Sequence, residues 1–428
     1  MSQPRRVFVT GVGAVTATGM NVDATWQALL AGQQGLGEST LWDLSTWSHR
    51  MVGELQDFQP AKMLPDRKLL KMISRQDVTG ISAGMQAVLD SQVIAYRDQL
   101  DPAAQIEFAD EFAVYVGSPG NKYFQQYDFL SVMMHSQGDM RVFAEHLFSE
   151  VHPMWLLRIL PNNVLAYLGI TYGLKGMNHN ITNHAVGGMQ ALLEAHAAIA
   201  SGKAQRALVV GYDLGAEPQA LFYYDKLGLI SAQDLKPFDA QHNGTILAEG
   251  ASALILESEE AVQQRSAHCY AEVIGGRTAT EAKGLFAIDP EAEALQALLT
   301  QTLERYDLSA QDLGMIIAHG NGSHLSDVTE AKALTAILAG EPVPVTAFKW
   351  SMGHTLCASG VLDTVLGLHA MQQRCVPGIA NLNTVSPECA ALNVSRDTRT
   401  WSEHSDHMLV INRGFGGMNA CVVLRACP

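Results

Sequence analysis

Residues 180–190 have the sequence NITNHAVGGMQ and join a short β-rich segment to a strongly helical one at residues 191–201. A strand that turns sharply into a helix through small residues is typical of a nucleophile elbow. Such a turn holds one side chain clear of the backbone, at a helix N-terminus that stabilises an anion. Ser or Cys is expected at the apex, but this chain has Ala185. We therefore predict a nucleophile elbow that lacks the nucleophilic side chain.

Length and composition indicate a well-buried globular protein. The 428 residues are 47% hydrophobic and 17% charged, enough for two or three average domains or one large α/β unit with an internal duplication. The formal charge of −15 argues against nucleic acid and against an anionic membrane as partners. No apolar run reaches the ~18 residues of a membrane span, and the polar start after Met1 does not resemble a signal peptide.

The six cysteines all follow residue 268 and show no CxxC spacing. Their density is too low for a disulfide framework, and this usage favours a reducing, cytoplasmic environment.

Short hydrophobic strands alternate with helical segments along the chain. Strands are expected at residues 6–10, 111–117, 206–213, 249–257, 315–318, 343–348 and 408–412, and helices at 21–30, 72–96, 291–306 and 355–372. This alternation predicts an α/β fold with parallel sheets covered on both faces. Gly11 and Gly13 after the first strand predict a tight turn, since a dinucleotide fingerprint would need glycine in place of Thr16.

Two segments allow more than one interpretation. The basic residues from Lys62 to Arg75 are either a solvated amphipathic helix or a docking patch for an acidic carrier protein. The aromatic and Met residues between Lys122 and Leu160 are those of a hydrophobic core, of an apolar acyl tunnel or of a partner interface.

Blocks along the whole chain resemble one family. They are VTGVG at residues 9–13, PFD at 237–239 with EGA at 249–251, HGNGS at 319–323, KWSMGH at 349–354 and GFGGMN at 414–419. In this order they resemble the β-ketoacyl-acyl-carrier-protein synthases, decarboxylating condensing enzymes of the thiolase fold. The resemblance implies two related βαβαβαββ halves in five α-β-α-β-α layers, divided here as residues 1–255 and 256–428.

The resemblance also implies a reaction. In the family, a Cys thiolate takes an acyl chain from carrier protein, and the enolate left when a malonyl thioester loses CO₂ attacks it. By motif match, His319 and His354 donate hydrogen bonds to the malonyl thioester oxygen, and Lys349 orients the loops and charges. Backbone N–H groups of Ala185 and Phe415 form an oxyanion hole, and Phe415 and Gly416 belong to the gate loop. The resemblance implies no cofactor and no metal.

The departures concern the elbow. The family usually has Thr-Ala-Cys there, where this chain has Asn183-His184-Ala185. No alanine can carry an acyl chain, so condensation by this subunit alone should be lost. Cys357 replaces a residue that is commonly glycine in the family, and we expect it to be a packing cysteine because it lies off the elbow.

Three functions remain open. The first is a chain-length factor, a non-condensing subunit that forms a heterodimer with a homologous Cys-bearing ketosynthase and shapes the acyl tunnel in type II polyketide or fatty acid biosynthesis. Acyl carrier protein bearing acyl- or malonyl-phosphopantetheine would then be the second partner. The alternatives are a malonyl-carrier decarboxylase that uses His319 and His354, and an active synthase with an engineered Cys-to-Ala change at 185.

Overall fold

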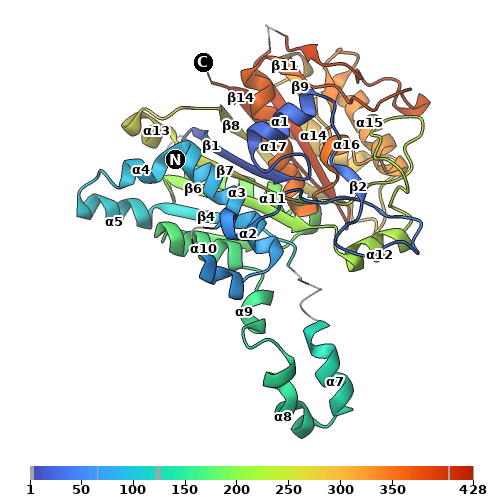
Figure 1. Cartoon of the computed structure of the whole chain (residues 1–428). Helices are drawn as coiled ribbons and strands as arrows, with labels where there is room; N and C mark the ends of the chain where they lie inside the picture. The colour runs from blue at the N-terminus through green and yellow to red at the C-terminus, as the bar shows by residue number, and fades with distance from the viewer. Residues whose placement is uncertain (1–3, 65, 121, 123–126, 403–404, 428) are drawn as a thin grey trace.

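The computed structural model describes residues 4–64, 66–120, 122, 127–402 and 405–427. A mixed ten-stranded sheet forms its centre, in the order β10-β9-β13-β14-β8-β1-β7-β6-β4-β5 (Figure 1). The strands are β1 (Val7–Thr16), β4 (Phe112–Gly117), β5 (Asn178–Ile181), β6 (Arg206–Leu214), β7 (Glu249–Ser258), β8 (Ala271–Thr280), β9 (Leu313–Ile317), β10 (Val345–Thr346), β13 (His407–Gly414) and β14 (Met418–Ala426). Two small ribbons pair β2 (Leu36–Glu38) with β3 (Met51–Gly53) and β11 (Cys375–Val376) with β12 (Arg399–Thr400).

The ten strands are two copies of one five-strand pattern. In the first, β5, β4 and β6 are parallel neighbours, and β7 and β1 follow as antiparallel ones. In the second, β10, β9 and β13 are parallel, and β14 and β8 follow in the same way. The copies join where β1 pairs with β8. We propose to divide the halves after Ser258, because residue 255 lies inside β7.

Helices cover the strands in layers. Helices α3 (Arg75–Ser91) and α10 (Asn163–Tyr172) lie against the first set, and α14 (Glu293–Arg305), with α15 (His324–Leu338) packed on it, lies against the second. Between the sets, α11 (Gly187–Ala200) and α17 (Ser359–Gln372) contact each other and strands of both. The expected five-layer α/β arrangement is therefore present. The remaining helices include α1 (Val22–Leu30), α2 (Pro60–Met63), α4 (Val93–Arg97), α5 (Pro102–Asp110), α12 (Pro218–Lys226), α13 (Glu259–Arg265) and α16 (Lys349–Met352).

Strand β6 shows how the sequence forms these layers. Leu208 and Val210 belong to the core under α3, whereas Val209 belongs to the core that contains α11 and α17. Alternate side chains of a strand point to opposite faces. A strand buried on both faces therefore needs a continuous apolar run, as residues 207–210 provide.

The first predicted turn is wrong, because β1 continues through both glycines to Thr16. A Cβ at Gly11 would lie 2.4 Å from the carbonyl oxygen of Ala87, and one at Gly13 would lie 2.1 Å from that of Ala83. The glycines let the α3 backbone approach the strand. They serve packing rather than a change of direction.

Two helix predictions also need correction. The helix expected at 72–96 is interrupted at Gln92, whose φ of 58° ends α3 before α4 begins. The basic run after Lys62 is not one amphipathic helix but the short α2 and the 3-10 helix η1 (Arg67–Lys71). In this run, Arg75 is paired with Glu249.

A disulfide joins Cys269 to Cys427, a pairing that the cysteine spacing did not predict. The sheet register explains the contact, since Ala271 of β8 lies opposite Ala426 of β14 and the two cysteines flank this rung. Among the described residues, no helix combines the length and apolarity needed to cross a bilayer.

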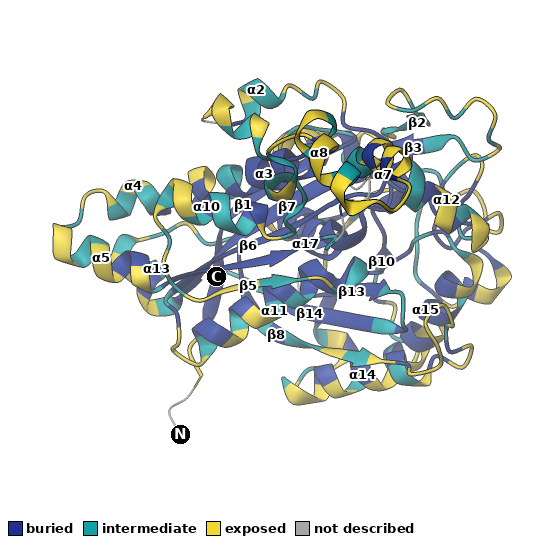
Figure 2. Ribbon diagram, turned by 90° about the horizontal axis from the view of Figure 1, so that it is seen from below, coloured by how far each residue is buried: buried dark blue, intermediate teal, exposed yellow. Residues whose placement is uncertain are grey.

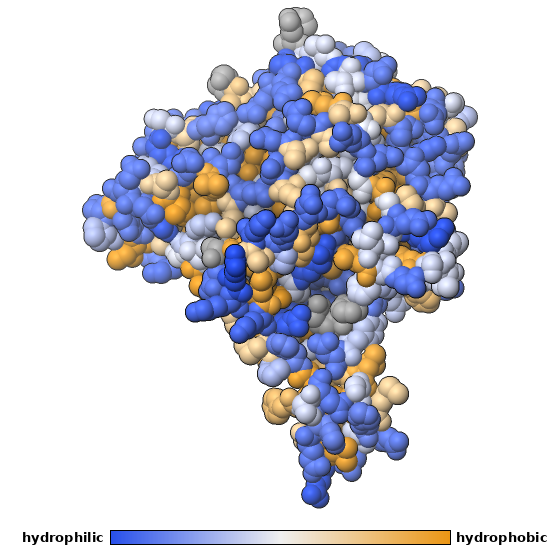
Figure 3. All heavy atoms as spheres, in the orientation of Figure 1, coloured by the Kyte–Doolittle hydropathy of each residue, from blue (hydrophilic) through white to orange (hydrophobic). Residues whose placement is uncertain are grey.

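The segment between Lys122 and Leu160 does not form the core that helical spacing favoured. Helices α7 (Leu130–Ser136), α8 (Met140–Glu150) and α9 (Trp155–Ile159) project away from the layers (Figure 1). Much of this projection is exposed, and hydrophobic surface is visible on it (Figures 2 and 3). Met134 and Phe148 are among its exposed apolar residues. Phe124 of the same predicted cluster lies outside the described residues.

Candidate active site

The predicted elbow lies between β5 and α11. After Ile181 the chain passes through the 3-10 helix η3 (His184–Val186) into α11. His184 has a φ of 48°, a left-handed conformation that costs a non-glycine residue ~1–2 kcal/mol. The following Ala185 is 1% exposed. The turn predicted from the sequence is present, and alanine occupies its apex.

The second half contains a matching turn. The 3-10 helix η5 (Leu356–Ala358) enters α17 as η3 enters α11, and Leu356 has a φ of 45°. Cys357 thus occupies in this turn the position that Ala185 occupies in the first. It lies off the Ala185 elbow and is fully buried, as expected of a packing cysteine, because the two turns pack together. A Cβ at Gly188 would lie 2.3 Å from the Cys357 carbonyl oxygen, which explains the glycine after the first elbow.

The two predicted histidines lie together in buried loops. Their rings are 5.1 Å apart between centroids and nearly perpendicular, at 82°. His319 Nδ1 accepts a hydrogen bond from the Arg413 N–H at 3.3 Å, and His354 Nδ1 accepts one from the Leu356 N–H at 3.3 Å. A neutral imidazole that accepts at Nδ1 carries its proton at Nε2. Both rings therefore keep one N–H donor for a ligand.

The surroundings keep both rings neutral. Burial, together with the Lys349 ammonium group, holds the pKa of His319 and the pKa of His354 well below the ordinary value of 6.5. Lys349 lies behind the site and pairs with Asp363 through a 2.7 Å contact. Burial of that pair raises the Asp363 pKa. Lys349 thus acts on the histidines through its field.

The gate loop lies directly over the elbow. Phe415 contacts three rings: His184 at 4.4 Å, Tyr224 at 5.1 Å and Phe286 at 5.4 Å between centroids. Tyr224 also forms a 3.1 Å hydrogen bond between its hydroxyl and His184 Nε2. Gly416 has a φ of 80° and donates its N–H to the Leu285 carbonyl oxygen at 2.7 Å. Glycine permits this sharp turn, which presents Phe415 to the elbow.

One pocket, a cavity of about 80 Å³ that is partly open to solvent, brings most of the predicted residues together. Ala185, His319, His354 and Phe415 line it, whereas Lys349 and Gly416 do not. A Cβ added at Gly414 would lie 3.5 Å from the Ala185 nitrogen, so the gate loop begins beside the elbow amide. Among the described residues, no hydrogen bond uses the N–H of Ala185 or of Phe415. Both remain available as donors.

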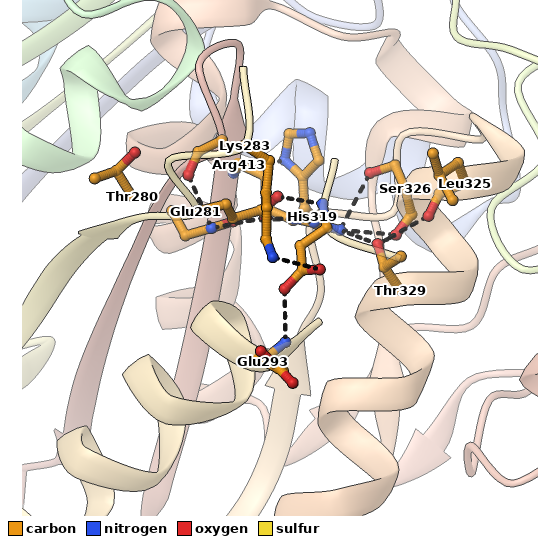
Figure 4. A network of polar contacts seen from close by, with 12 residues as sticks. Thr280, Glu281, Lys283, Glu293, His319, Leu325, Ser326, Thr329 and Arg413 are labelled. Atoms are coloured by element: carbon orange, nitrogen blue, oxygen red, sulfur yellow. Dashed lines mark hydrogen bonds and ion pairs between the residues drawn. The ribbon is translucent and has the colours of Figure 1, made fainter. Parts of the chain in front are cut away.

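The sequence reasoning missed a buried ion pair in the pocket wall. The guanidinium of Arg413 donates to Glu281 Oε1 at 3.1 Å and to the Ser326 carbonyl oxygen at 2.8 Å (Figure 4). It also donates to Asn419 Oδ1 at 3.0 Å. The Arg413 backbone N–H is also the donor that fixes the His319 ring. A charged residue at the end of the buried strand 408–412 was the only signal in the sequence.

His184 lies in the pocket wall, directly before the elbow apex. Burial lowers its pKa from 6.5 to about 4, and its Nδ1 is buried without a hydrogen-bond partner among the described residues. A neutral ring between Tyr224 and Phe415 covers the elbow on the pocket side. Because His184 stands where the family usually has the small Ala of Thr-Ala-Cys, the sequence already pointed to an obstructed pocket or a partner contact at this position.

Comparisons with known proteins agree with this geometry. A curated relative, 3-oxoacyl-[acyl-carrier-protein] synthase 2 of Coxiella burnetii, is 27% identical over 433 residues and covers 99% of both chains. Two solved structures share the fold at 22% identity. "The ishigamide ketosynthase/chain length factor" has a TM-score of 0.85 and covers 99% of this chain and 100% of its own. A type II PKS ketosynthase described in complex with its acyl-carrier protein has a TM-score of 0.83 and covers 100% of each chain.

Family models account for most of the sequence. The model described as the beta-ketoacyl synthase N-terminal domain matches residues 4–261, and that of the C-terminal domain matches residues 270–383. The first spans the elbow, and the second spans both histidine loops. With two imidazole donors, a gate loop and an elbow in one pocket, the chain belongs to the β-ketoacyl synthase family.

Proposed function

We propose that this chain is a non-condensing ketosynthase-like subunit, which pairs with a Cys-bearing β-ketoacyl synthase and shapes its acyl tunnel in type II polyketide or fatty acid biosynthesis. One observation carries the proposal: Ala185 occupies the elbow apex, where the family chemistry needs a thiolate. An alanine methyl group forms no thioester, so an acyl chain has no attachment point here. Condensation then requires the elbow of another subunit.

No other side chain replaces the missing thiol. The described residues that line the pocket include no cysteine. Cys357 lies behind the elbow, and burial, reinforced by the neighbouring Asp213, raises its pKa well above the usual 9.0. A thiol held protonated and away from the pocket is a poor nucleophile.

The surface supports a partner on the β5 side. Strand β5 ends the sheet, and its outer edge carries backbone groups that no neighbouring strand pairs among the described residues. Such an edge is a template for pairing with another chain. Nearby on α10, Ile170 is 75% exposed. A separate group of exposed apolar side chains lies on the projection of α7 and α8: Met133, Met134, Met140 and Phe148. Exposed apolar surface gathered in this way favours a protein contact.

The carrier protein would use a different surface. Lys62, Arg67, Lys68 and Lys71 are exposed on α2 and η1, in a chain whose overall charge is −15. A local basic patch attracts an acidic partner even when the net charge is negative. We assign this patch to acyl carrier protein in the cytoplasm.

Co-expression tests the proposal. The chain is produced alone and with each Cys-bearing ketosynthase of the same source organism, and native mass spectrometry measures the assemblies. We expect a 1:1 heterodimer only in the co-expressed samples, and longer or more uniform products than with the ketosynthase alone. A stable homodimer that forms no complex with any of these ketosynthases would refute the partner role.

A second function is favoured by the retained donors. The Nε2–H groups of His319 and His354 would hold the thioester oxygen of malonyl-carrier protein while the carboxylate leaves as CO₂. The enolate so formed would take a proton and give acetyl-carrier protein, without any thiolate. Fixed donors of this kind typically lower a barrier by ~3 kcal/mol each.

Mass spectrometry of the carrier arm tests this decarboxylase. The purified chain should convert malonyl- to acetyl-carrier protein, and His319→Ala or His354→Ala should slow the conversion by ~100-fold or more. His146→Ala on the projection is the matched control. Equal rates in all four proteins would exclude decarboxylation at this site.

A further inference from the structure

Two histidines and a glutamate from three separate segments meet beside the pocket. His242 comes from the loop 237–244, His324 begins α15, and Glu388 belongs to the 3-10 helix η6 (Pro387–Cys389). One nitrogen or oxygen of each lies within 4.8 Å of the others. His242 is buried, whereas His324 and Glu388 are about half exposed. From this juxtaposition we propose a binding site for a divalent transition metal of the zinc type.

Asp327 prepares His242 as a ligand. Asp327 Oδ2 lies 3.1 Å from His242 Nδ1 and accepts the Phe238 N–H at 2.9 Å. Because a carboxylate oxygen only accepts, the proton of the ring lies at Nδ1, and Nε2 presents a lone pair to the side of His324. A carboxylate on the far nitrogen is the usual support of a metal-bound histidine.

The three side chains face one another at short range. His324 Nδ1 lies 2.8 Å from His242 Nε2. On the other side of the same ring, His324 Nε2 lies 3.4 Å from Glu388 Oε2. An ion bound by His242 Nε2 and His324 Nδ1 would replace the hydrogen bond between the two rings.

Hydrogen bonds hold the His242 loop against the Glu388 segment. Asp239 accepts the N–H groups of Asn383 and Thr384 at 2.7 and 3.0 Å. Ser386, two residues before Glu388, donates its N–H to the Phe238 carbonyl oxygen at 2.8 Å. The His242 loop and the Glu388 segment are therefore tied together before any ion binds. A preformed frame of this kind distinguishes the cluster from a chance surface group.

The ligand chemistry selects the metal. Two imidazole nitrogens and one carboxylate oxygen suit Zn²⁺, with water as a fourth, tetrahedral ligand. Half-exposed His324 can shift by the ~0.5 Å needed to place both nitrogens about 2.0–2.1 Å from the ion. The ion would join the Ser323–His324 turn, which borders the pocket, to the loop 237–244. Its role would be to fix this wall of the pocket.

Metal titration of the chelator-treated, tag-free chain tests the site. Isothermal titration with Zn²⁺ should give one ion per chain, and Co²⁺ should give the visible bands of a tetrahedral complex. His324→Ala should raise the Kd by about 100-fold and Glu388→Gln by about 10-fold. Both side chains are half exposed, so both variants should fold, as circular dichroism checks.

His146→Ala is the matched control, because His146 is another exposed histidine 3.5 Å from a glutamate oxygen, on α8. This variant should keep the full affinity. The proposal is overturned if no saturable binding occurs, or if Zn²⁺ binding survives in His324→Ala. Because neither readout depends on a partner subunit or on turnover, the result is independent of the proposed function.

Discussion

The imidazole of His184 stacks on the ring of Phe415, with centroids 4.4 Å apart and ring planes 21° from parallel. One residue precedes the elbow apex and the other is the centre of the gate loop, so the contact ties these two parts together. Tyr224 holds the other side of the imidazole through its hydroxyl group. The missing thiol and the stacked histidine therefore act at the same place, the elbow apex. An acyl chain would find neither an attachment point nor a clear approach at residue 185.

Restoring the thiol alone should not restore synthase chemistry. In Ala185→Cys, we expect slow alkylation by iodoacetamide and little acyl transfer from acyl-carrier protein, because His184 and Phe415 cover the apex. Adding His184→Gly removes the ring that covers the apex and should raise the alkylation rate by ~10-fold or more. The double variant should still fold, because loss of a stacked pair costs only about 1 kcal/mol. Glycine is the right replacement because it adopts the φ of 48° without strain.

Intact-mass measurement of the labelled chains gives both rates, and His184→Gly without the new cysteine corrects for labelling elsewhere. Full acyl transfer by Ala185→Cys alone would instead identify the chain as a synthase with an engineered elbow. The partner role would then lose the observation on which it depends.

Much of the site could be predicted from the sequence because its residues lie in short blocks. Glycine-flanked histidines, the turn at Ala185 and the gate glycines each depend on local backbone geometry, and the resemblance placed them in one pocket. The contacts that were missed join distant segments. Arg413 meets Glu281 across 132 positions and His242 meets Asp327 across 85, distances along the chain that no local pattern encodes.

The fold predictions failed for related reasons. In the sequence, glycines inside a buried strand look like those of a turn. Their role becomes clear only when a helix is seen to pack too closely for a side chain, as Ala83 of α3 does at Gly13. Apolar residues at helical spacing resemble a core whether they are covered or not. On α8, Phe148 is exposed within the described chain, and only tertiary structure distinguishes the two cases.

Asp213 should make the chain less stable as the pH rises. Its carboxyl is buried, and desolvation raises its pKa from 3.8 to about 7. Between these values the folded state binds a proton that the unfolded state has released, so the free energy of unfolding falls with increasing pH. The stabilising contribution of the Asp213 carboxyl is complete below 3.8, its pKa in the unfolded state. This contribution is lost as the pH rises through about 7, its pKa in the folded state.

Urea denaturation at pH 5 and pH 8 checks this effect. Relative to Asp213→Asn, the wild-type chain should lose about 2–3 kcal/mol of unfolding free energy between the two pH values. Asp110→Asn, a change at an exposed position of α5, should leave the pH dependence as it is. Parallel curves for wild type and Asp213→Asn would show that the carboxyl is ionised throughout.

The ion pair of Arg413 and Glu281 should matter more than its exposed counterparts. In Glu281→Gln, the guanidinium remains buried without a counter-charge. This change should lower the free energy of unfolding by about 3–5 kcal/mol. Glu291→Gln removes an exposed carboxylate paired with Lys332 and should cost less than about 1 kcal/mol. Thermal and urea unfolding of both variants measure the difference. Equal losses would mean that the buried pair is solvated in solution.

The partner surface gives the last prediction. Ile170 on α10 and Ile106 on α5 are both exposed isoleucines on helices, at 75% and 57%. The helix of Ile170, α10, packs against the edge strand β5, whereas the helix of Ile106, α5, packs against the inner strand β4. If this edge joins a Cys-bearing ketosynthase, Ile170→Asp buries an unpaired charge in the interface and should raise the heterodimer Kd by at least ~10-fold. Ile106→Asp should leave the Kd unchanged.

Both changes are made in the co-expressed complex, and analytical ultracentrifugation over a dilution series measures the Kd. Each chain is also unfolded alone, because an exposed Ile-to-Asp change should alter the free energy of unfolding by no more than ~0.5 kcal/mol. If Ile170→Asp and Ile106→Asp dissociate the complex equally, the β5 edge is not the contact. If neither does, the partner binds through another face, and the projection of α7 and α8 with Phe148 becomes the surface to vary next.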